Sequence, residues 1–79
     1  MSDARTGIVT VRFRHAMPLE QRLRQFIRMG VTVMDHDDAA ATCDVAVPDG
    51  TQWEWSRRFA DLPGVVSVAY TRPRSIADN

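Results

Sequence analysis

The sequence predicts a small α+β domain in which four antiparallel strands form one sheet and two helices cover one of its faces. Three observations indicate this class. Segments with an apolar residue at every second position alternate with segments whose apolar residues recur every three or four positions. Along the chain these segments run strand, helix, strand, strand, helix, strand. A glycine follows each helix at a matching place, Gly30 in the first half and Gly64 in the second.

Length and composition suit one domain. The chain has 79 residues, and we expect a single domain over 1–79 with an ordered core over about 7–72 and short tails at 1–6 and 73–79. The net charge is zero, which argues against duplex nucleic acid and anionic membranes as partners. No apolar run reaches the length of a membrane span, and no signal-peptide core precedes Gly7. The expected location is therefore the cytoplasm.

The first strand is expected over residues 8–14, where apolar and polar side chains alternate strictly. Val9, Val11 and Phe13 then face the core. The residues turned the other way are Thr10, Arg12 and Arg14.

The first helix is expected over residues 18–29. Pro18 suits the first helical position, because its φ is already helical and its missing N–H would have no partner there. Gly30 is the expected end of the helix. The apolar residues with helical spacing are Leu19, Leu23, Phe26 and Ile27, and the residues off this stripe include Arg22, Arg24 and Arg28.

The second and third strands are expected over residues 31–34 and 42–47. Between them lies an acidic stretch, residues 36–39, that is typical of a loop. The third strand alternates again, with Cys43, Val45 and Val47 on the core side. Because Cys43 is the only cysteine, no intrachain disulfide can form, and we expect its thiol to be buried.

The second helix is expected over residues 51–62, and Pro63 and Gly64 end it. Thr51 and Glu54 have the spacing of a capping box, in which the threonine hydroxyl accepts a hydrogen bond from the third helical N–H. The core stripe is Trp55, Phe59 and Leu62, and Trp53 lies off it, so its ring should be half exposed. In the last strand the residues expected on one face are Val66, Val68 and Tyr70.

Each half of the chain is thus one strand–helix–strand unit. Two right-handed crossovers of this kind give the ferredoxin-like split βαβ fold, with the expected strand order 4-1-3-2. The predicted core is Val9, Val11, Phe13, Leu23, Phe26, Ile27, Val33, Val45, Val47, Trp55, Phe59, Leu62, Val66 and Val68.

Specific chemistry is scarce in this sequence. Aromatic residues are missing from the outward positions of the two central strands, which argues against RNA stacking. One imidazole and one thioether in the stretch from His15 to Pro18 are too few for a tight metal site, and the acidic stretch around His36 is expected to be solvated. No nucleophile with a spaced base or orienting partner is evident. We therefore expect neither an enzyme nor a bound cofactor or metal.

Four segments resemble the propeptides of subtilisin-like serine proteases: VTVRFR at 9–14, MGVTV at 29–33, DVAVPDG at 44–50 and LPGVVSVAY at 62–70. These propeptides are ferredoxin-like chaperones and inhibitors, and some exist as free-standing inhibitors. The resemblance implies that the open sheet face lies on two surface helices of a protease. It also implies that acidic side chains cap those helices and that the C-terminal segment enters the substrate cleft in an extended form.

Applied to this chain, the resemblance predicts a non-catalytic protein-binding module. Its outward residues are mostly small (Thr42, Ala46, Ser67 and Ala69), which suits close packing. The acidic stretch supplies carboxylates for positive helix ends. The residues expected to contact the partner are Arg12, Arg14, Asp35, Asp37, Asp38, Asp44, Tyr70, Thr71 and Arg72.

Two alternatives remain open. The sequence is also similar to ACT-like regulatory domains, which dimerise through sheet edges and bind a small ligand at a glycine-bearing loop after the first strand. Here the segment from His15 to Pro18 has no glycine. This counts against ligand binding but not against a homodimer. A structural or adaptor subunit is the third hypothesis.

Overall fold

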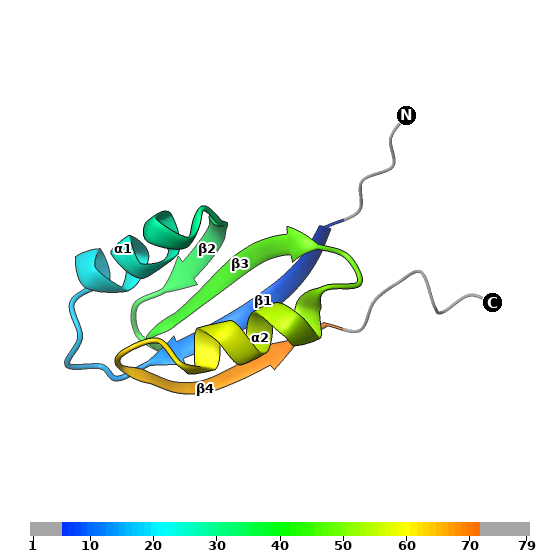
Figure 1. The fold of residues 1–79 in the computed structure, drawn as a ribbon. Helices are drawn as coiled ribbons and strands as arrows, with labels where there is room; N and C mark the ends of the chain where they lie inside the picture. Colours follow the sequence, from blue (N-terminus) through cyan, green and yellow to red (C-terminus); the bar gives the residue numbers. More distant parts are fainter. Residues whose placement is uncertain (1–5, 72–79) are drawn as a thin grey trace.

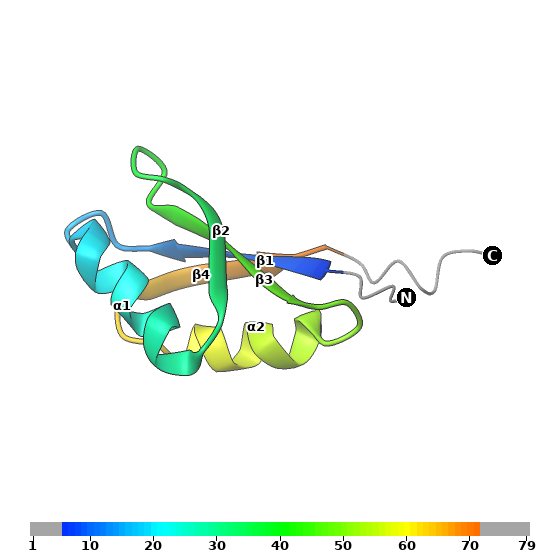
Figure 2. The ribbon, with the colours of Figure 1, turned by 90° about the horizontal axis from the view of Figure 1, so that it is seen from above.

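The computed structural model describes residues 6–71. The elements are β1 (Thr6–Phe13), α1 (Leu19–Met29), β2 (Thr32–Asp37), β3 (Thr42–Pro48), α2 (Gln52–Ala60) and β4 (Val65–Tyr70) (Figure 1). The strands form one antiparallel sheet in the order β2-β3-β1-β4. Both helices lie on the same side of it (Figure 2). The predicted α+β ferredoxin-like fold and its strand order are thereby confirmed.

The core lies between the sheet and the two helices. Phe26 of α1 joins the layers, because its ring packs edge-on against Phe13 of β1 at 5.8 Å and against Phe59 of α2 at 5.3 Å between ring centroids. Both are the geometry that aromatic pairs prefer. The buried cluster is Val9, Val11, Phe13, Phe26, Cys43, Val45, Val47 and Phe59. The predicted burial of Cys43 is confirmed.

β1 begins earlier than predicted, because Thr6 and Gly7 already pair with Pro48 and Val47 of β3. Gly7 is buried, and any side chain at this position would overlap Gln52, the fully buried first residue of α2. The Gln52 side chain lies close against β1 there. It accepts a hydrogen bond from the Gly50 N–H at 2.6 Å and donates one to Asp49 at 2.9 Å.

The predicted stripe of α1 is wrong in one respect. Arg22 is buried with 3% of its surface exposed, whereas Ile27 is 73% exposed. Arg22 and Phe26 are four residues apart and share one side of the helix, and Ile27 lies about 100° around the axis from Phe26. The buried Arg22 guanidinium donates hydrogen bonds to backbone carbonyls of the segment before the helix, and these bonds compensate for the burial of its charge.

A β-bulge removes Val66 from the core, contrary to the prediction. Phe13 pairs with Val65 and Arg12 pairs with Ser67, so Val66 is the extra residue of β4 and is 60% exposed. Val65 packs against the core in its place. Past the bulge the alternation resumes. Val68 lies opposite Val11 and packs against the core, and its predicted place in the core is confirmed.

The β2 strand also differs from the prediction. It continues through Asp37, so His36 pairs with Cys43 and does not lie in a loop. Met34 is the extra residue between the Val33–Val45 and Asp35–Asp44 pairs. The hairpin turn is confined to residues 38–41. Where a strand extends beyond the hydrophobic core, its residues are polar on both faces, so the sequence alone does not distinguish them from loop residues.

The helix ends agree only in part with the predictions. Gly30 ends α1 in the left-handed region at φ 76°, as expected. Pro18 is extended and caps α1 from outside it, and α1 starts at Leu19. The capping box is wrong, because the Thr51 hydroxyl donates to the Pro48 carbonyl at 2.7 Å. The α2 helix stops at Ala60, two residues before the predicted end.

Candidate functional site

The face of the sheet that points away from the helices is called the open face here. Strand pairing places its residues in rows across the sheet. One row is Asp35–Asp44–Thr10–Ala69, and the next is Asp37–Thr42–Arg12–Ser67. No element of residues 6–71 covers this side of the sheet (Figure 2). Most of its side chains are short, so the backbone of the sheet is accessible to close approach.

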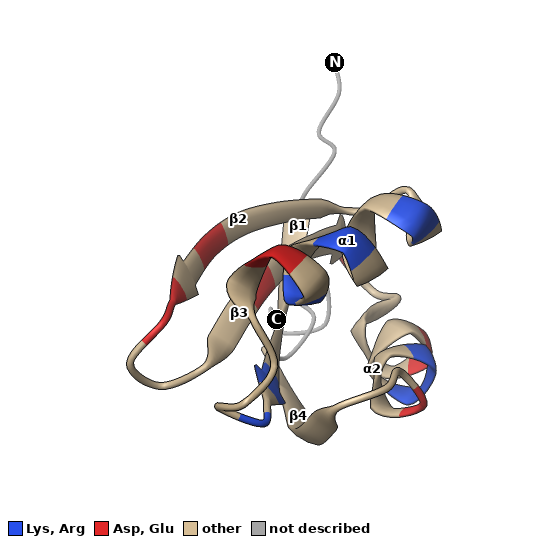
Figure 3. Ribbon diagram, turned by 90° about the vertical axis from the view of Figure 1, so that its left-hand side faces the viewer, with Lys and Arg blue, Asp and Glu red and all other residues tan. Residues whose placement is uncertain are grey.

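Charge is distributed unevenly over the open face. Asp35 of β2 lies directly opposite Asp44 of β3, and the red segments along β2 mark the acidic side in Figure 3. The Thr10 hydroxyl donates a hydrogen bond to the Asp44 carboxylate at 2.7 Å. Arg12, in the strand next to β3, is exposed. The main charged features are the carboxylate pair of β2 and β3 and the guanidinium of Arg12, which lies near the end of β1.

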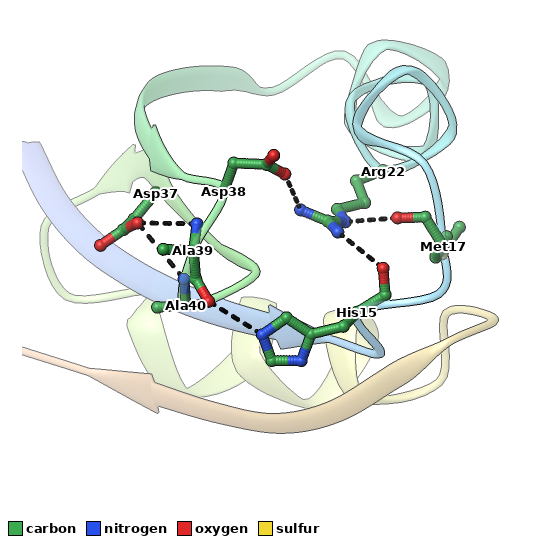
Figure 4. A network of polar contacts seen from close by, with 7 residues as sticks. All are labelled: His15, Met17, Arg22, Asp37, Asp38, Ala39 and Ala40. Carbon is green, nitrogen blue, oxygen red and sulfur yellow. Dashed lines mark hydrogen bonds and ion pairs between the residues drawn. The ribbon is translucent and has the colours of Figure 1, made fainter.

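Asp35, Asp37 and Asp38 are near neighbours in the sequence, but the structure gives them different surroundings. The Asp37 carboxylate accepts hydrogen bonds from the N–H groups of Ala39 and Ala40, at 3.0 and 3.3 Å, and so shapes the hairpin turn. Asp38 forms an ion pair with Arg22 at 3.1 Å (Figure 4). Asp38 is therefore directed at the helix layer, and Asp35 is the residue of the three that pairs with Asp44 on the open face.

Arg22 is the residue that sequence reasoning missed. Its Nε donates to the Met17 carbonyl at 2.8 Å, and an Nη donates to the His15 carbonyl at 3.4 Å. The second Nη is the one paired with Asp38, and the His15 ring lies 2.9 Å from the Ala39 carbonyl (Figure 4). These contacts join the segment before α1 to the β2–β3 turn. Arg22 lies four residues before Phe26 and therefore on the same side of the helix, and this spacing is the signal that could have revealed its burial.

The remaining predicted contact residues lie at the ends of β1 and β4. Arg14 follows β1, is exposed, and donates its backbone N–H to Gly64 at 2.9 Å. Tyr70 ends β4 and is 44% exposed. The Thr71 N–H donates to the Ile8 carbonyl at 3.1 Å, so Thr71 is tied to β1. Arg72 lies outside the described residues.

The remaining aromatic, thiol and charged side chains do not form a second candidate site within residues 6–71. Trp53 is 56% exposed, as predicted, and the guanidinium of Arg57 lies 5.0 Å from its ring centre. Burial raises the pKa of the Cys43 thiol, which keeps the sulfur protonated and poorly nucleophilic. Within residues 6–71 no three His, Cys, Asp or Glu side chains are grouped to hold a metal ion. A shallow depression at the end of α2 is lined by Arg57, Arg58, Ala60 and Asp61.

Comparisons with models of protein families, with curated proteins and with solved structures give no match for this chain. Neither helix in the described range is long and apolar enough to cross a membrane.

Proposed function

We propose that this chain is a small non-catalytic domain that binds a protein partner on the open face of its sheet. The observation that carries the proposal is the combination of exposure, short side chains and charged residues on that face. It is uncovered within residues 6–71, and its central rows carry short side chains together with the Asp35–Asp44 pair and Arg12. A helix packs closely on a sheet whose side chains are short, and charged groups at the sides fix its orientation.

The carboxylate pair indicates the chemistry of the partner. Like charges directly opposite each other in neighbouring strands destabilise the free domain. A partner that brings partial positive charge to Asp35 and Asp44 relieves this repulsion, and the N-termini of helices carry such charge. The partner is therefore a protein that presents helix N-termini on its surface. The resemblance of four sequence segments to subtilase propeptides supports a subtilisin-like serine protease as this partner, and we propose that this chain is its inhibitor.

Two observations bear on which residues of the C-terminal segment can make the extended contact that the proposal requires. Tyr70 belongs to β4, and the Thr71 N–H and hydroxyl are both engaged with Ile8. Under the proposal, a segment that enters a protease cleft starts after Thr71. Truncation after Thr71 preserves every hydrogen bond described for the sheet, so it tests the segment without shortening β4.

The experiment is a titration of the purified protein against a subtilisin-type protease, with hydrolysis of a peptide substrate as the readout. We expect inhibition at micromolar concentration. Asp35→Lys should weaken it at least about tenfold, since reversal of a charge facing a helix N-terminus turns attraction into repulsion. Glu54→Lys is the matched control, because it makes the same change on an exposed position of α2, away from the open face. Truncation after Thr71 should also weaken inhibition.

Digestion of the protein without inhibition would exclude the protease as the partner. Equal losses from Asp35→Lys and Glu54→Lys would show that the open face is not the contact surface.

A further inference from the structure

The two edges of the sheet are built differently. The β2 edge carries Asp35, His36 and Asp37, and such charged residues protect an edge strand from pairing with another chain. The β4 edge reads Val-Val-Ser-Val-Ala-Tyr, with no charged residue and no proline. In Figures 1 and 3 no described element lies outside β4. An uncharged edge of six residues is the kind that pairs with another strand.

Apolar side chains are exposed along the same edge. Val66 is 60% exposed and Tyr70 is 44% exposed, and Val68 between them is partly buried. Val68 and Tyr70 lie opposite Val11 and Val9 of β1 and so face the helix side of the sheet. A strand added beside β4 would cover these side chains as well as the edge backbone.

Backbone hydrogen bonding fixes which groups of β4 point outward. The Thr71 N–H donates inward to the Ile8 carbonyl of β1. Because the direction alternates along an antiparallel strand, Ser67 and Ala69 also bond inward, and the N–H and C=O groups of Val68 and Tyr70 point outward. In a strand added to this edge, Val68 and Tyr70 must therefore pair with residues of the same outward set.

We propose that β4 pairs antiparallel with β4 of a second copy of this chain, about a twofold axis through Val68. Val68 then lies opposite its own counterpart, and Tyr70 lies opposite Val66 of the second copy. The result is one eight-stranded sheet with all four helices on the same side. In this register all three outward residues of β4, Val66, Val68 and Tyr70, lie opposite outward residues of the second β4.

A second copy suits this edge for two reasons. Pairing of two β4 strands brings no charged side chains together. Pairing of two β2 strands would instead bring Asp35 and Asp37 of one copy close to the aspartates of the other. The pairing is also self-complementary, as an isologous twofold contact requires. A six-residue strand is about 20 Å long, so the contact is one strand wide and short. Stable interfaces bury about 800 Å² per partner, so the dimer is weak and depends on concentration.

Sedimentation velocity and light scattering over roughly 10 µM to 1 mM protein test the proposal, the range in which so small a contact should associate. We expect the mean mass to rise from 8.9 kDa towards twice that value. Val66→Lys should weaken association at least about tenfold, since it places a charge in the contact. Met34→Lys is the matched control, because Met34 is also the extra residue of a bulged edge strand and is also 60% exposed.

The register is tested with opposite charges. Val66→Lys and Tyr70→Glu should each weaken the dimer, and the double variant should recover much of the loss, because the two positions face each other across the twofold axis. Thermal unfolding by circular dichroism checks that every variant is folded.

Three results would overturn the inference. The first is a wild-type protein that stays monomeric at 1 mM, which would leave the β4 edge to a strand of another protein. The second is a loss of association from Met34→Lys as large as that from Val66→Lys. The third is a double variant that associates no more strongly than the single variants. The β4–β4 contact leaves the open face free. A failure to dimerise and a failure to inhibit the protease are therefore detected by different experiments.

Discussion

Arg22 shows how one side chain can alter the surroundings of a whole helix. It is a charged residue on the buried side of α1, and burial of a charge is costly unless hydrogen bonds and a counter-charge compensate. Here the guanidinium meets two carbonyls and the Asp38 carboxylate. Asp38 is 72% exposed, so the ion pair is screened by water and the carbonyl bonds are the stronger part.

Arg22→Ala should lower the free energy of unfolding by about 1–3 kcal/mol, because it leaves the Met17 and His15 carbonyls without their donor and removes packed methylene groups. Urea unfolding measures the loss. Arg24→Ala, an exposed change on the same helix, should stay within about 0.5 kcal/mol of the wild type.

Asp38→Asn separates the two contributions of Arg22. It removes the counter-charge but keeps the carbonyl bonds, so we expect a cost below about 1 kcal/mol. A cost as large as that of Arg22→Ala would mean that the ion pair dominates.

Cys43 makes the stability depend on alkaline pH. Burial raises the pKa of its thiol, the Arg22 guanidinium opposes the rise, and the Asp44 carboxylate adds to it. The folded state therefore holds the thiol proton more tightly than the unfolded state does. Stability should be unaffected by this group at neutral pH and should fall above roughly pH 8.5, where the unfolded thiol ionises, by at most about 1.4 kcal/mol per pH unit.

Urea unfolding between neutral pH and pH 10, for the wild type and for Cys43→Ala, measures this dependence. The decline should be steeper in the wild type, since alanine cannot ionise. Parallel curves would show that the thiol is accessible to water in the folded protein.

At the scale of elements, Phe59 is the fully buried aromatic residue through which α2 enters the core. Phe59 is fully buried against Phe26 and Trp55, whereas Trp53 on the same helix is mostly exposed. Phe59→Ala should cost about 3–5 kcal/mol, because it leaves a cavity in the centre of the core. In so small a domain the variant should be largely unfolded.

Trp53→Ala is the comparison on the same helix. It removes an exposed ring and its contact with Arg57, worth about 0.5–1 kcal/mol. Near-ultraviolet circular dichroism and urea unfolding should separate the two variants clearly. Similar losses would mean that α2 packs through its other side.

The elements also show where prediction from periodicity fails. Alternation and helical spacing located all six elements, because each buries one apolar side against the same core. A bulge shifts the phase of a strand by one residue, and neither Met34 nor Val66 differs in type from an ordinary core residue. The burial of Arg22 depends on carbonyls of the preceding segment, so hydropathy alone could not assign it.

At the scale of the whole molecule, the open face was predictable and the arrangement of its charges was not. Strand alternation correctly assigns the small outward residues and Arg12 to the open face. The hairpin carboxylates were predicted as one group because they are adjacent in sequence. Their roles separate only in three dimensions, where Asp37 bonds to the turn, Asp38 pairs with Arg22, and Asp35 lies beside Asp44.

The central position of β1 has a consequence for how the chain reaches its fold. β1 precedes the other strands of this sheet in the sequence. It pairs with β3 on one side and with β4 on the other, so Val9 of β1 lies opposite Tyr70 of β4. Contacts between such distant residues make folding slower than in helical domains of this size. During synthesis, β1, β2 and β3 can associate while one side of β1 is still unpaired. That unpaired side is an aggregation risk until β4 has emerged, so the last strand completes the sheet and also ends the exposure of the first.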